Sequence, residues 1–445
     1  MPDANVPRLT GAAALTALTD LGLASIAAGA IARRRPVIRL LERTQADARG
    51  VSRLRALHKE FGSGPVELAI PGRRILVILD PDDVGRVLAE SPNPFDPANR
   101  EKRQALQQFQ PHGVLISTGH MRDRRRAVNE AALDTPLALH RLAEPFTRAI
   151  EAEAGELAAE ALQRGSLDSS AFMTAWWRLV RRLVLGDAAR DDGAITDDLW
   201  RLRSAGNWAF LGLPHTRMRE RFFDRLYGYA EAADPNSLVG ALAQVPAEGA
   251  VDPVGQIPQW LFAFDAAGMA ALRAAAVLAT HPAALQQCET GDLGQVAVRP
   301  FLRACVLESV RLWPTTPTLL RDTSTETTWR DGAFTVDAGA AVMIIVPAFH
   351  RDPDLPFADE FVPDIWLDGR AQQYPQLVPF SAGPVECPGR NLVLFATSTL
   401  LANLLGTTSL ELRSTPRLEP SKPLPATLNQ LTLEFGVAPV SARVP

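Results

Sequence analysis

Cysteine and lysine are scarce in this chain of 445 residues. Its three cysteines are Cys288, Cys305 and Cys387. So odd and sparse a set argues against a disulfide framework and for a reducing compartment. Cys305 lies on an apolar helical stretch, so we expect it to be a small core residue. Cys288 has no partner at metal-site spacing. Only the surroundings of Cys387 indicate that its sulfur binds something.

No segment stands out by its composition. Low-complexity stretches, internal repeats and linkers rich in proline and glycine are missing, which argues against a chain of linked modules. Hydrophobic residues make up 47% of the chain and charged residues 22%, and the net charge is −4. This near-neutral balance gives no reason to expect nucleic acid as a partner. The composition is typical of a soluble globular protein with a large core.

The N-terminal stretch from Leu9 to Ala32 is rich in alanine and leucine and is followed by three arginines. A membrane-spanning helix needs about 20 apolar residues. This stretch supplies the length, but Asp20 and several hydroxyl residues interrupt it. A secretory signal fits poorly, because the positive charge follows the apolar run. A soluble or surface-lying helix is favoured, and a spanning anchor is the alternative.

Two regions carry strand and turn signals, and most of the remaining chain has a helical pattern. Residues 64–79 contain two strand-forming runs around Pro71-Gly72, which predicts a β-hairpin. Residues 323–346 are interpreted in the same way. The 3.6-residue periodicity predicts helices over about 137–163, 168–185, 196–232, 256–280, 297–312 and 388–406. The predicted fold class is therefore mainly α with small β-sheets.

The most informative run is Phe380 to Arg390, with the sequence FSAGPVECPGR. Phe380 offers an apolar wall, Gly383 permits a tight turn with positive φ, and Gly389 lets the backbone approach something flat and large. Amide groups at the start of the following helix would stabilise a negative sulfur on Cys387. The pattern F-x-x-G-x-x-x-C-x-G resembles the haem-ligand loop of the cytochrome P450 family.

The resemblance covers nearly the whole chain from about residue 60. It implies a helix-rich, triangular fold in which haem b lies between a long central helix and the helix of the cysteine loop. The thiolate of Cys387 would bind the iron, and Phe380, Gly383 and Gly389 would contact the cofactor. Residues 61–445 would form a single haem-binding domain. Residues 1–60 would form a helical extension, which is membrane-associated in the anchor interpretation.

Glu308 and Arg311 stand three apart, so they share one helix face and can pair. Alone, E-x-x-R is a weak motif. Here Trp313-Pro314 follows it, and Arg311 precedes Cys387 by 76 residues. Both facts match the family, in which this pair is structural. The family's P-E-R-F segment also contributes an arginine to that network, but here Ile365 stands in its place.

The resemblance also indicates which cations would bind the haem propionates. The position two before the thiolate is usually arginine or histidine in the family, but here it is Val385. His120 and Arg124, which lie one helical turn apart, match another propionate-binding segment, and Arg321 matches a third position. Two buried carboxylates need cationic partners, so we expect these three residues to supply them. His350 is interpreted as structural.

The predicted central helix should carry the oxygen-side residues. The family pattern is small-Gly-x-acid-Thr. Counting back from His281-Pro282 puts its acid at Asp265 and puts Ala266 where threonine is expected. A second register, on Ala267-Gly268, keeps a glycine but loses the acid. An aspartate in so apolar a run costs free energy unless it is hydrated or paired, which suggests a functional residue.

The alanine side chain cannot replace the hydrogen bonds of the usual threonine. Three alternatives remain: ordered water held near Asp265 substitutes for the hydroxyl, a substrate group supplies the contact, or the enzyme runs an atypical reaction. The family's substrate pocket maps onto mainly apolar segments, among them residues 97–117 and 209–214. The individual positions expected there are Phe264, Ala267, Thr318, Leu319 and Gln430.

The leading function implied by the resemblance is oxidation of a small, mostly apolar organic metabolite with O2. A separate ferredoxin or flavodoxin-type protein would supply two electrons, docking on a basic patch made of Arg122, Arg125, Arg126 and Arg390. The protein would be cytoplasmic, or peripheral to a membrane through its N-terminal segment. One alternative is an atypical oxidase or peroxide-driven enzyme for coupling, cyclisation or rearrangement, motivated by Ala266. Another is a haem-binding or substrate-binding protein without oxygen activation, motivated by Ala266, Val385 and Ile365 together.

Overall fold

The computed structural model describes residues 6–23, 29, 32–208, 215–291, 297–415 and 418–440. Its α-helices are α1 (Gly11–Leu18), α3 (Arg35–Arg43), α4 (Ala46–Phe61), α5 (Pro81–Ala89), α6 (Arg100–Leu106), α7 (Gly119–Ala132), α8 (Ala143–Arg164), α9 (Ser169–Leu185), α10 (Gly193–Gly206), α11 (Thr216–Ala232), α12 (Leu238–Ala243), α13 (Ile257–Leu278), α14 (Pro282–Gly291), α15 (Pro300–Leu312), α16 (Val346–His350) and α17 (Arg390–Thr407).

Shorter helical turns connect these elements. One is a π-helix, η1 (Thr19–Leu23), and the others are 3-10 turns: η2 (Val114–Ile116), η3 (Asp187–Ala189), η4 (Gly249–Val251), η5 (Val254–Gln256), η6 (Pro363–Trp366), η7 (Arg370–Gln373), η8 (Gly383–Val385) and η9 (Gln430–Thr432). Side-chain caps begin several helices where the sequence offers them. Asp168 accepts a hydrogen bond from the Ala171 amide at the start of α9, and Ser237 accepts one from the Gly240 amide at the start of α12.

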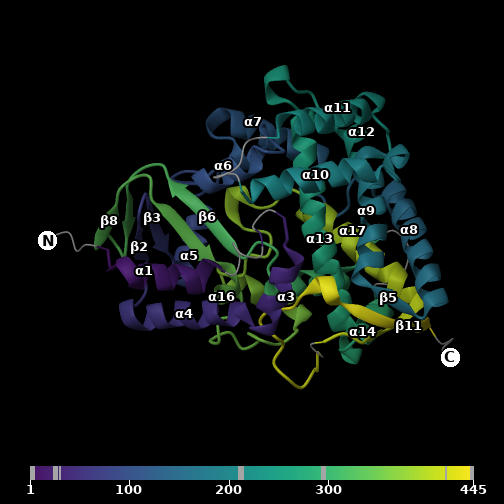
Figure 1. Cartoon of the computed structure of the whole chain (residues 1–445). Helices are drawn as coiled ribbons and strands as arrows, with labels where there is room; N and C mark the ends of the chain where they lie inside the picture. Colours follow the sequence, from purple (N-terminus) through teal and green to yellow (C-terminus); the bar gives the residue numbers. More distant parts are fainter. Residues whose placement is uncertain are drawn as a thin grey trace.

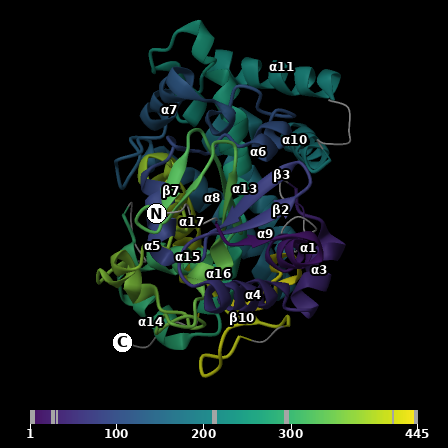
Figure 2. The same cartoon turned by 90° about the vertical axis from the view of Figure 1, so that its left-hand side faces the viewer.

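The strands are β1 (Arg8–Leu9), β2 (Val66–Ile70), β3 (Arg73–Val77), β4 (Phe95–Asp96), β5 (Ser166–Asp168), β6 (Thr318–Thr323), β7 (Thr327–Trp329), β8 (Phe334–Val336), β9 (Ala341–Ile345), β10 (Thr408–Leu412) and β11 (Glu434–Pro439). They form a six-stranded sheet in the order β1-β2-β3-β9-β6-β4, a three-stranded sheet in the order β10-β11-β5, and the two-stranded β7-β8 pair. The six-stranded sheet lies on one side of the molecule and the long helices fill the other, as Figure 1 shows. Figure 2 faces the side of the sheet.

The buried apolar side chains gather in two large cores. One lies among the helices and includes α8, α9, α13, α15 and α17. The other lies against the six-stranded sheet and takes in residues of α1, η1, α4 and α5. A third, small cluster surrounds Ile365. The helix-rich fold with small sheets is therefore confirmed.

Helix α13 runs through the centre of the helical side (Figure 1) and is buried along most of its length. A helix that is apolar nearly all round is stable only inside a protein or a membrane. Gly268 lets α9 approach closely, because a Cβ there would lie 2.6 Å from the Trp176 ring. Trp176 Nε1 donates a hydrogen bond to the Phe264 carbonyl at 2.7 Å. These contacts fix α13 against α9.

Several sequence predictions need revision in detail. The hairpin at 64–79 is confirmed, with Val66 opposite Val77 in the antiparallel β2-β3 pair. In the 323–346 region, β7 and β8 pair with each other, but β9 joins the large sheet between β3 and β6. The helix predicted over 196–232 is divided into α10 and α11.

The environment of the N-terminal stretch stays a prediction, as does the division into a 1–60 extension and a 61–445 domain. Part of the 9–32 stretch lies outside the described residues, but Ala14, Ala17 and Leu21 are buried in the sheet-side core. Within the described part, one helical stretch, Gly249–Leu278, is long and apolar enough to cross a membrane. Its burial inside the protein is typical of a core helix.

Candidate functional site

The cysteine loop has the tight backbone that its glycines predict. The Cys387 amide donates to the Phe380 carbonyl at 3.0 Å, and the Glu386 amide donates to the Gly383 carbonyl at 3.0 Å. Gly383 has φ +66°, and a Cβ there would lie 2.3 Å from the Leu88 carbonyl oxygen. Only glycine satisfies both constraints. The loop thus packs against the end of α5 and fixes where Cys387 sits.

Helix α7 and the segment after it brace the same loop. Arg126 Nη1 donates to the Glu386 carbonyl at 2.7 Å, and Thr135 Oγ1 donates to the Pro388 carbonyl at 2.8 Å. Asn391 Nδ2 donates to the Thr135 carbonyl at 3.1 Å. These bonds hold the residues on both sides of Cys387 through elements more than 250 positions earlier in the chain.

Burial raises the pKa of the Cys387 thiol. It outweighs three influences that favour the thiolate: a hydrogen bond from the Gly389 amide and the charges of Arg126 and Arg390. The protein alone therefore holds a neutral thiol in a site that is partly prepared for the charged form. A bound cation such as iron would supply the remaining stabilisation, because a coordinating thiol is deprotonated outright.

Glu308 and Arg311 form a fully buried, two-pronged ion pair on α15. Arg311 Nε and Nη2 donate to the two Glu308 oxygens at 2.8 and 2.7 Å. The other Arg311 hydrogen bonds go to backbone carbonyls of residues 350, 357, 358 and 360. Arg311 thus ties the segment at 350–360 to α15, which packs against α17, the helix that follows the cysteine loop.

Ile365 stands where the family has an arginine that joins the Glu308–Arg311 network. The neighbouring Trp366 supplies a hydrogen bond to Glu308 instead. Trp366 Nε1 donates to Glu308 Oε2 at 2.9 Å, and the Val362 amide donates to Glu308 Oε1 at 3.0 Å. Ile365 instead fills the small third core. The sequence interpretation noted the loss at Ile365 but missed the replacement by its neighbour.

His350 is buried next to this pair and is held as the neutral ring. Its Nε2 accepts a hydrogen bond from the Val378 amide at 2.9 Å, so the proton lies on Nδ1, 3.2 Å from the Arg311 carbonyl. Burial, followed by the Arg311 charge, lowers the pKa of His350 to about 3. These contacts fit the structural role that the sequence suggested.

Three cations gather near the cysteine loop: Arg122 and Arg321, which are buried, and Lys102, which is partly exposed. Arg321 is 3% exposed, and its Nη2 lies 3.5 Å from Ser381 Oγ in that loop. Burial, then Arg122, lowers the pKa of Arg321 to about 10, and burial, then Arg321, lowers that of Lys102 to about 7. Asp96 is the carboxylate whose charge acts on all three.

The two predicted propionate partners on α7, His120 and Arg124, do not point toward these cations. His120 is exposed, and Arg124 forms an ion pair with Glu248. Arg122 is the α7 cation that points inward: it is 5% exposed, and its Nε has no hydrogen-bond partner among the described residues. The roles of His120 and Arg124 stay predictions. Because Arg122 is buried, it cannot belong to the basic surface patch that the sequence suggested.

The oxygen-side aspartate is paired. Asp265 Oδ2 lies 2.6 Å from Arg203 Nη2 of α10, and the Arg203 guanidinium lies 4.6 Å from the centre of the Phe262 ring. Phe262, Ala263, Asp265 and Ala266 form a partly exposed patch on a helix whose following residues are buried. Arg203, the partner of Asp265, lies 62 positions earlier in the chain, so no local sequence pattern predicts this pair.

The predicted substrate residues divide into two groups. Phe264 and Ala267 are buried in the helical core. Thr318 and Leu319 lie on β6 and are partly exposed. Gln430 lies in η9, where its side chain accepts from Arg273 and donates to the Met269 sulfur. The turn at 209–214, also expected in the pocket, lies outside the described residues.

The residues around Cys387 fit a flat, apolar group that carries acidic substituents. Phe380 packs against the helical core and Ala382 against the sheet-side core, so the loop lies where the two cores meet. Both residues are partly exposed, as are Phe262, Leu319 and Leu320. A Cβ added to Gly389 would meet no atom within 4 Å. Buried cations without enough carboxylate partners complete the fit, because anionic groups would stabilise them.

The sequence did not predict the roles of Lys102 and Trp366, and it placed Arg122 on the surface instead of inside. For Arg122 a signal existed: it shares one face of α7 with Asn129 and Ala132, which are also buried. No local pattern places Lys102 near Arg321. Trp366 lies next to the position that the family pattern singles out.

Comparisons with known proteins agree with this geometry. The cytochrome P450 family model matches residues 284–435. Cytochrome P450 714A2 of Arabidopsis thaliana is 30% identical over 147 residues, which are 32% of this chain and 28% of that protein. Cyclooctat-9-en-7-ol 5-monooxygenase of Streptomyces melanosporofaciens is 35% identical over 107 residues, 23% of each protein. The chain therefore aligns with about a quarter of the length of these curated relatives.

Two solved structures share the fold over most of their length. The crystal structure of the cytochrome P450 CYP102L1 has a TM-score of 0.70 and 18% identity, and the match covers 88% of this chain and 94% of that one. The cyanobacterial CYP120A1 with bound retinoic acid has a TM-score of 0.70 and 16% identity, with coverage of 87% and 94%. Cytochrome P450 proteins bind haem through a cysteine thiolate. Residues 284–435 thus match the cytochrome P450 family model, and most of the chain shares its fold with solved cytochrome P450 structures.

Proposed function

We propose that the protein is a haem-thiolate monooxygenase that oxidises a small, mostly apolar organic molecule. The observation that carries this proposal is the cysteine loop, in which a partly buried thiol lies between two apolar cores and near the buried cations Arg122 and Arg321. When bound, a thiolate-ligated haem supplies the activation of dioxygen. The net reaction inserts one oxygen atom into a C–H bond and reduces the other to water, with two electrons and two protons consumed.

The residues that would hold the haem follow from the site. Cys387 would bind the iron, and the Gly389 amide would stabilise its sulfur. Arg321, Arg122 and Lys102 would pair with the propionates, with His120 and Arg124 as the positions that the family pattern favours. Phe380 and Gly383 would shape the cysteine-loop side. Glu308 and Arg311 would act at a distance, by fixing the backbone that supports this region.

On the oxygen side, Asp265 and Ala266 would lie next to the reacting atoms. Asp265 is held by Arg203 at 2.6 Å. To move a proton, the carboxylate would have to exchange this partner for water. Ala266 offers no hydroxyl to hold that water, so proton delivery would depend on Asp265 or on a group of the substrate.

The substrate class is proposed from the apolar character of the predicted pocket: Phe264, Ala267, Thr318, Leu319 and Gln430. One relative is named for acting on cyclooctat-9-en-7-ol, and one structural neighbour binds retinoic acid. The names of these ligands indicate an alcohol and a carboxylic acid, and we propose a mostly apolar molecule with one such polar group here. A secondary metabolite of this type would suit the pocket.

Electrons would come from a separate ferredoxin or flavodoxin-type protein, and we propose a cytoplasmic location. Arg125, Arg126 and Arg390 are partly exposed and lie close to the cysteine loop in sequence or by contact. They would attract an acidic donor protein. Arg126 and Arg390 already contact Glu130 and Glu386, which reduces the positive charge available for docking.

Ala266 also favours a second candidate function, a peroxide-driven or otherwise atypical oxidase. Such chemistry depends less on proton delivery through the central helix. A protein that binds haem without activating oxygen is a third outcome.

One experiment separates these functions. The purified protein is screened by haem spectral shift against terpenoid alcohols and carboxylic acids, and the best ligand is incubated with a surrogate ferredoxin system under isotopically labelled dioxygen. A monooxygenase places one labelled atom in the product. Product formed only with hydrogen peroxide supports the second candidate. A haem-loaded protein that shifts with ligand but forms no product under either condition contradicts both enzymatic proposals.

A further inference from the structure

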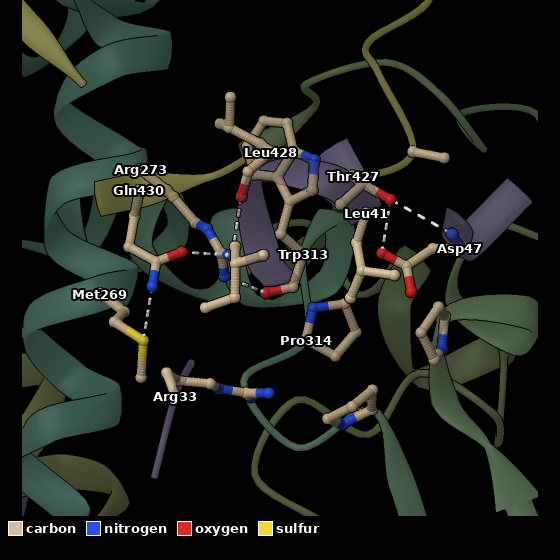
Figure 3. A pocket seen from close by; sticks show the side chains of 14 residues that line it. Arg33, Leu41, Asp47, Met269, Arg273, Trp313, Pro314, Thr427, Leu428 and Gln430 are labelled. Carbon is tan, nitrogen blue, oxygen red and sulfur yellow. Dashed lines mark hydrogen bonds between the residues drawn. The ribbon is translucent and has the colours of Figure 1, made fainter. Parts of the chain in front are cut away.

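A cavity of about 70 Å³ lies at the side of α13 that faces the N-terminal segment. Figure 3 shows its wall, which combines apolar side chains such as Met269, Trp313 and Leu428 with the charged residues Arg33, Arg273 and Asp47. A water molecule occupies about 30 Å³ in the liquid. The cavity therefore has room for one end of a molecule, such as a carboxylate with a methylene group.

Arg273 forms one wall of this cavity. Its Nη1 donates to the Trp313 carbonyl at 2.9 Å, and its Nη2 donates to the Leu428 carbonyl and to Gln430 Oε1 at 2.9 and 2.8 Å. Its Nε is buried and has no hydrogen-bond partner among the described residues. Burial, then Arg33, lowers the pKa of Arg273 to about 9. The guanidinium is oriented by neutral oxygens, and no carboxylate within the described part forms a salt bridge with it.

Arg33 approaches from the N-terminal segment. Its Nη2 donates to the Thr315 carbonyl at 2.7 Å, and its Nη1 lies 3.5 Å from the Gly29 carbonyl. Each arginine has five N–H donors. The hydrogen bonds of Arg33 and Arg273 within the described part number five in total, so half of the ten donors have no partner among the described residues.

The nearby acidic residues, Asp47 and Glu42, accept hydrogen bonds from groups other than the two arginines. Asp47 accepts a hydrogen bond from Thr427 Oγ1 at 2.7 Å, and Glu42 accepts one from the Asn429 amide at 2.7 Å. Both act on Arg273 only through longer-range attraction, and burial raises the pKa of both carboxyls. Two guanidinium groups thus share a cavity that holds no directly paired anion among the described residues. Burying such charges is costly without an anionic partner.

The cavity is aligned with the proposed oxygen side. Asp265, Met269 and Arg273 follow one another at intervals of four residues, so they lie along one face of α13. The Asp265 charge also acts on Arg33. Seven residues separate Ala266 from Arg273, which is about 10 Å along the helix. A molecule whose anionic end lies at Arg273 would extend its apolar body past Met269 toward Ala266.

From this arrangement we infer that Arg33 and Arg273 bind the carboxylate of an amphipathic organic acid whose oxidised carbon lies about 10 Å away. The inference rests on the proposed function for the identity of the oxidised end, but the carboxylate site itself does not. Two guanidinium groups match a carboxylate well, because their planar donors can bind both oxygens.

The test compares dodecanoate with dodecan-1-ol, which have the same chain but differ in charge. Binding to the haem-loaded protein is measured by titration calorimetry and by haem spectral shift at neutral pH. The wild type should bind the acid at least about tenfold more tightly, since hydrogen bonds to charged groups are worth about 1.5–3 kcal/mol. Arg33→Gln and Arg273→Gln should each weaken acid binding about ten- to hundredfold and change alcohol binding less than about twofold.

Two further variants make the test specific. Arg39→Gln removes an exposed guanidinium from the neighbouring α3, outside the cavity, and should change neither ligand's affinity. Asp47→Asn keeps an oxygen for the Thr427 hydroxyl but removes a negative charge, so acid binding should become tighter. Improper folding would not produce such a gain.

Equal binding of acid and alcohol by the wild type, or equal losses for both ligands in the arginine variants, would overturn the inference. Weaker acid binding in Asp47→Asn would also contradict it. The proposed function fails separately. If calorimetry shows the selective losses but no ligand is oxidised, the carboxylate site stands and the monooxygenase proposal falls. If the alcohol is oxidised and the arginine variants bind the acid as tightly as the wild type does, the monooxygenase proposal stands and the carboxylate site falls.

Discussion

Replacing Trp366 with phenylalanine should lower the free energy of unfolding by about 2 kcal/mol. The indole Nε1 donates to Glu308 Oε2 at 2.9 Å, and Glu308 is fully buried. Arg311 and the Val362 amide supply the other three hydrogen bonds to this carboxylate, which has about four acceptor sites. Phenylalanine leaves the fourth site empty, and a hydrogen bond to a charged group is worth about 1.5–3 kcal/mol.

Urea unfolding of the protein in excess haem, followed by circular dichroism, measures this loss. Trp200→Phe is the matched control, because Trp200 is 56% exposed and its substitution should change stability by no more than about 0.5 kcal/mol. If the two variants lose the same stability, the Trp366 bond does not replace the missing arginine and the reasoning is wrong. A loss above about 4 kcal/mol would indicate a packing defect as the main cause.

Three other substitutions test separate parts of the site. Asp265→Asn should slow turnover at least about tenfold while substrate affinity stays nearly unchanged, as expected for a proton-transfer group; normal turnover would reduce Asp265 to a structural partner of Arg203. Folding lowers the pKa of His350 to about 3, so between about pH 6.5 and 3 the unfolded chain binds a proton that the folded protein does not. The free energy of unfolding should therefore fall as pH drops from about 6.5 toward 3, by up to roughly 1.4 kcal/mol per pH unit. His350→Gln should flatten this part of the stability curve, and an unchanged slope would contradict the assignment. Arg122→Gln should lower haem occupancy of the purified protein more than Arg124→Gln does, and the opposite order would favour the α7 register that the family pattern suggests.

Much of the fold could be predicted from the sequence because long helices carry a strong periodic signal. The stretches near 168–185, 256–280 and 388–406 correspond to α9, α13 and α17 within a few residues. The sheet formed by β10, β11 and β5 was missed. Its strands are short, and Thr408 pairs with Pro439 across 31 positions, so no local turn marks the pairing.

The residues of the site also divide into those that local motifs predict and those that only the folded chain brings together. The cysteine loop and the Glu308–Arg311 pair are local motifs, and their backbone and ion-pair geometry follow from residues close in sequence. Arg203 meets Asp265, and Lys102 approaches Arg321, only because the chain folds back over long distances. Such contacts depend on helix packing, which one sequence does not reveal.

Thiolate ligation by Cys387 is tested most directly by the absorption spectrum of the reduced protein with carbon monoxide. The wild type should show the long-wavelength band typical of a thiolate-ligated haem, and Cys387→Ala should lose it. Cys288→Ala and Cys305→Ala, which change the two fully buried cysteines, should keep it. Persistence of the band in Cys387→Ala, or its loss in either control with the protein still folded, would contradict the assignment of Cys387 as the iron ligand.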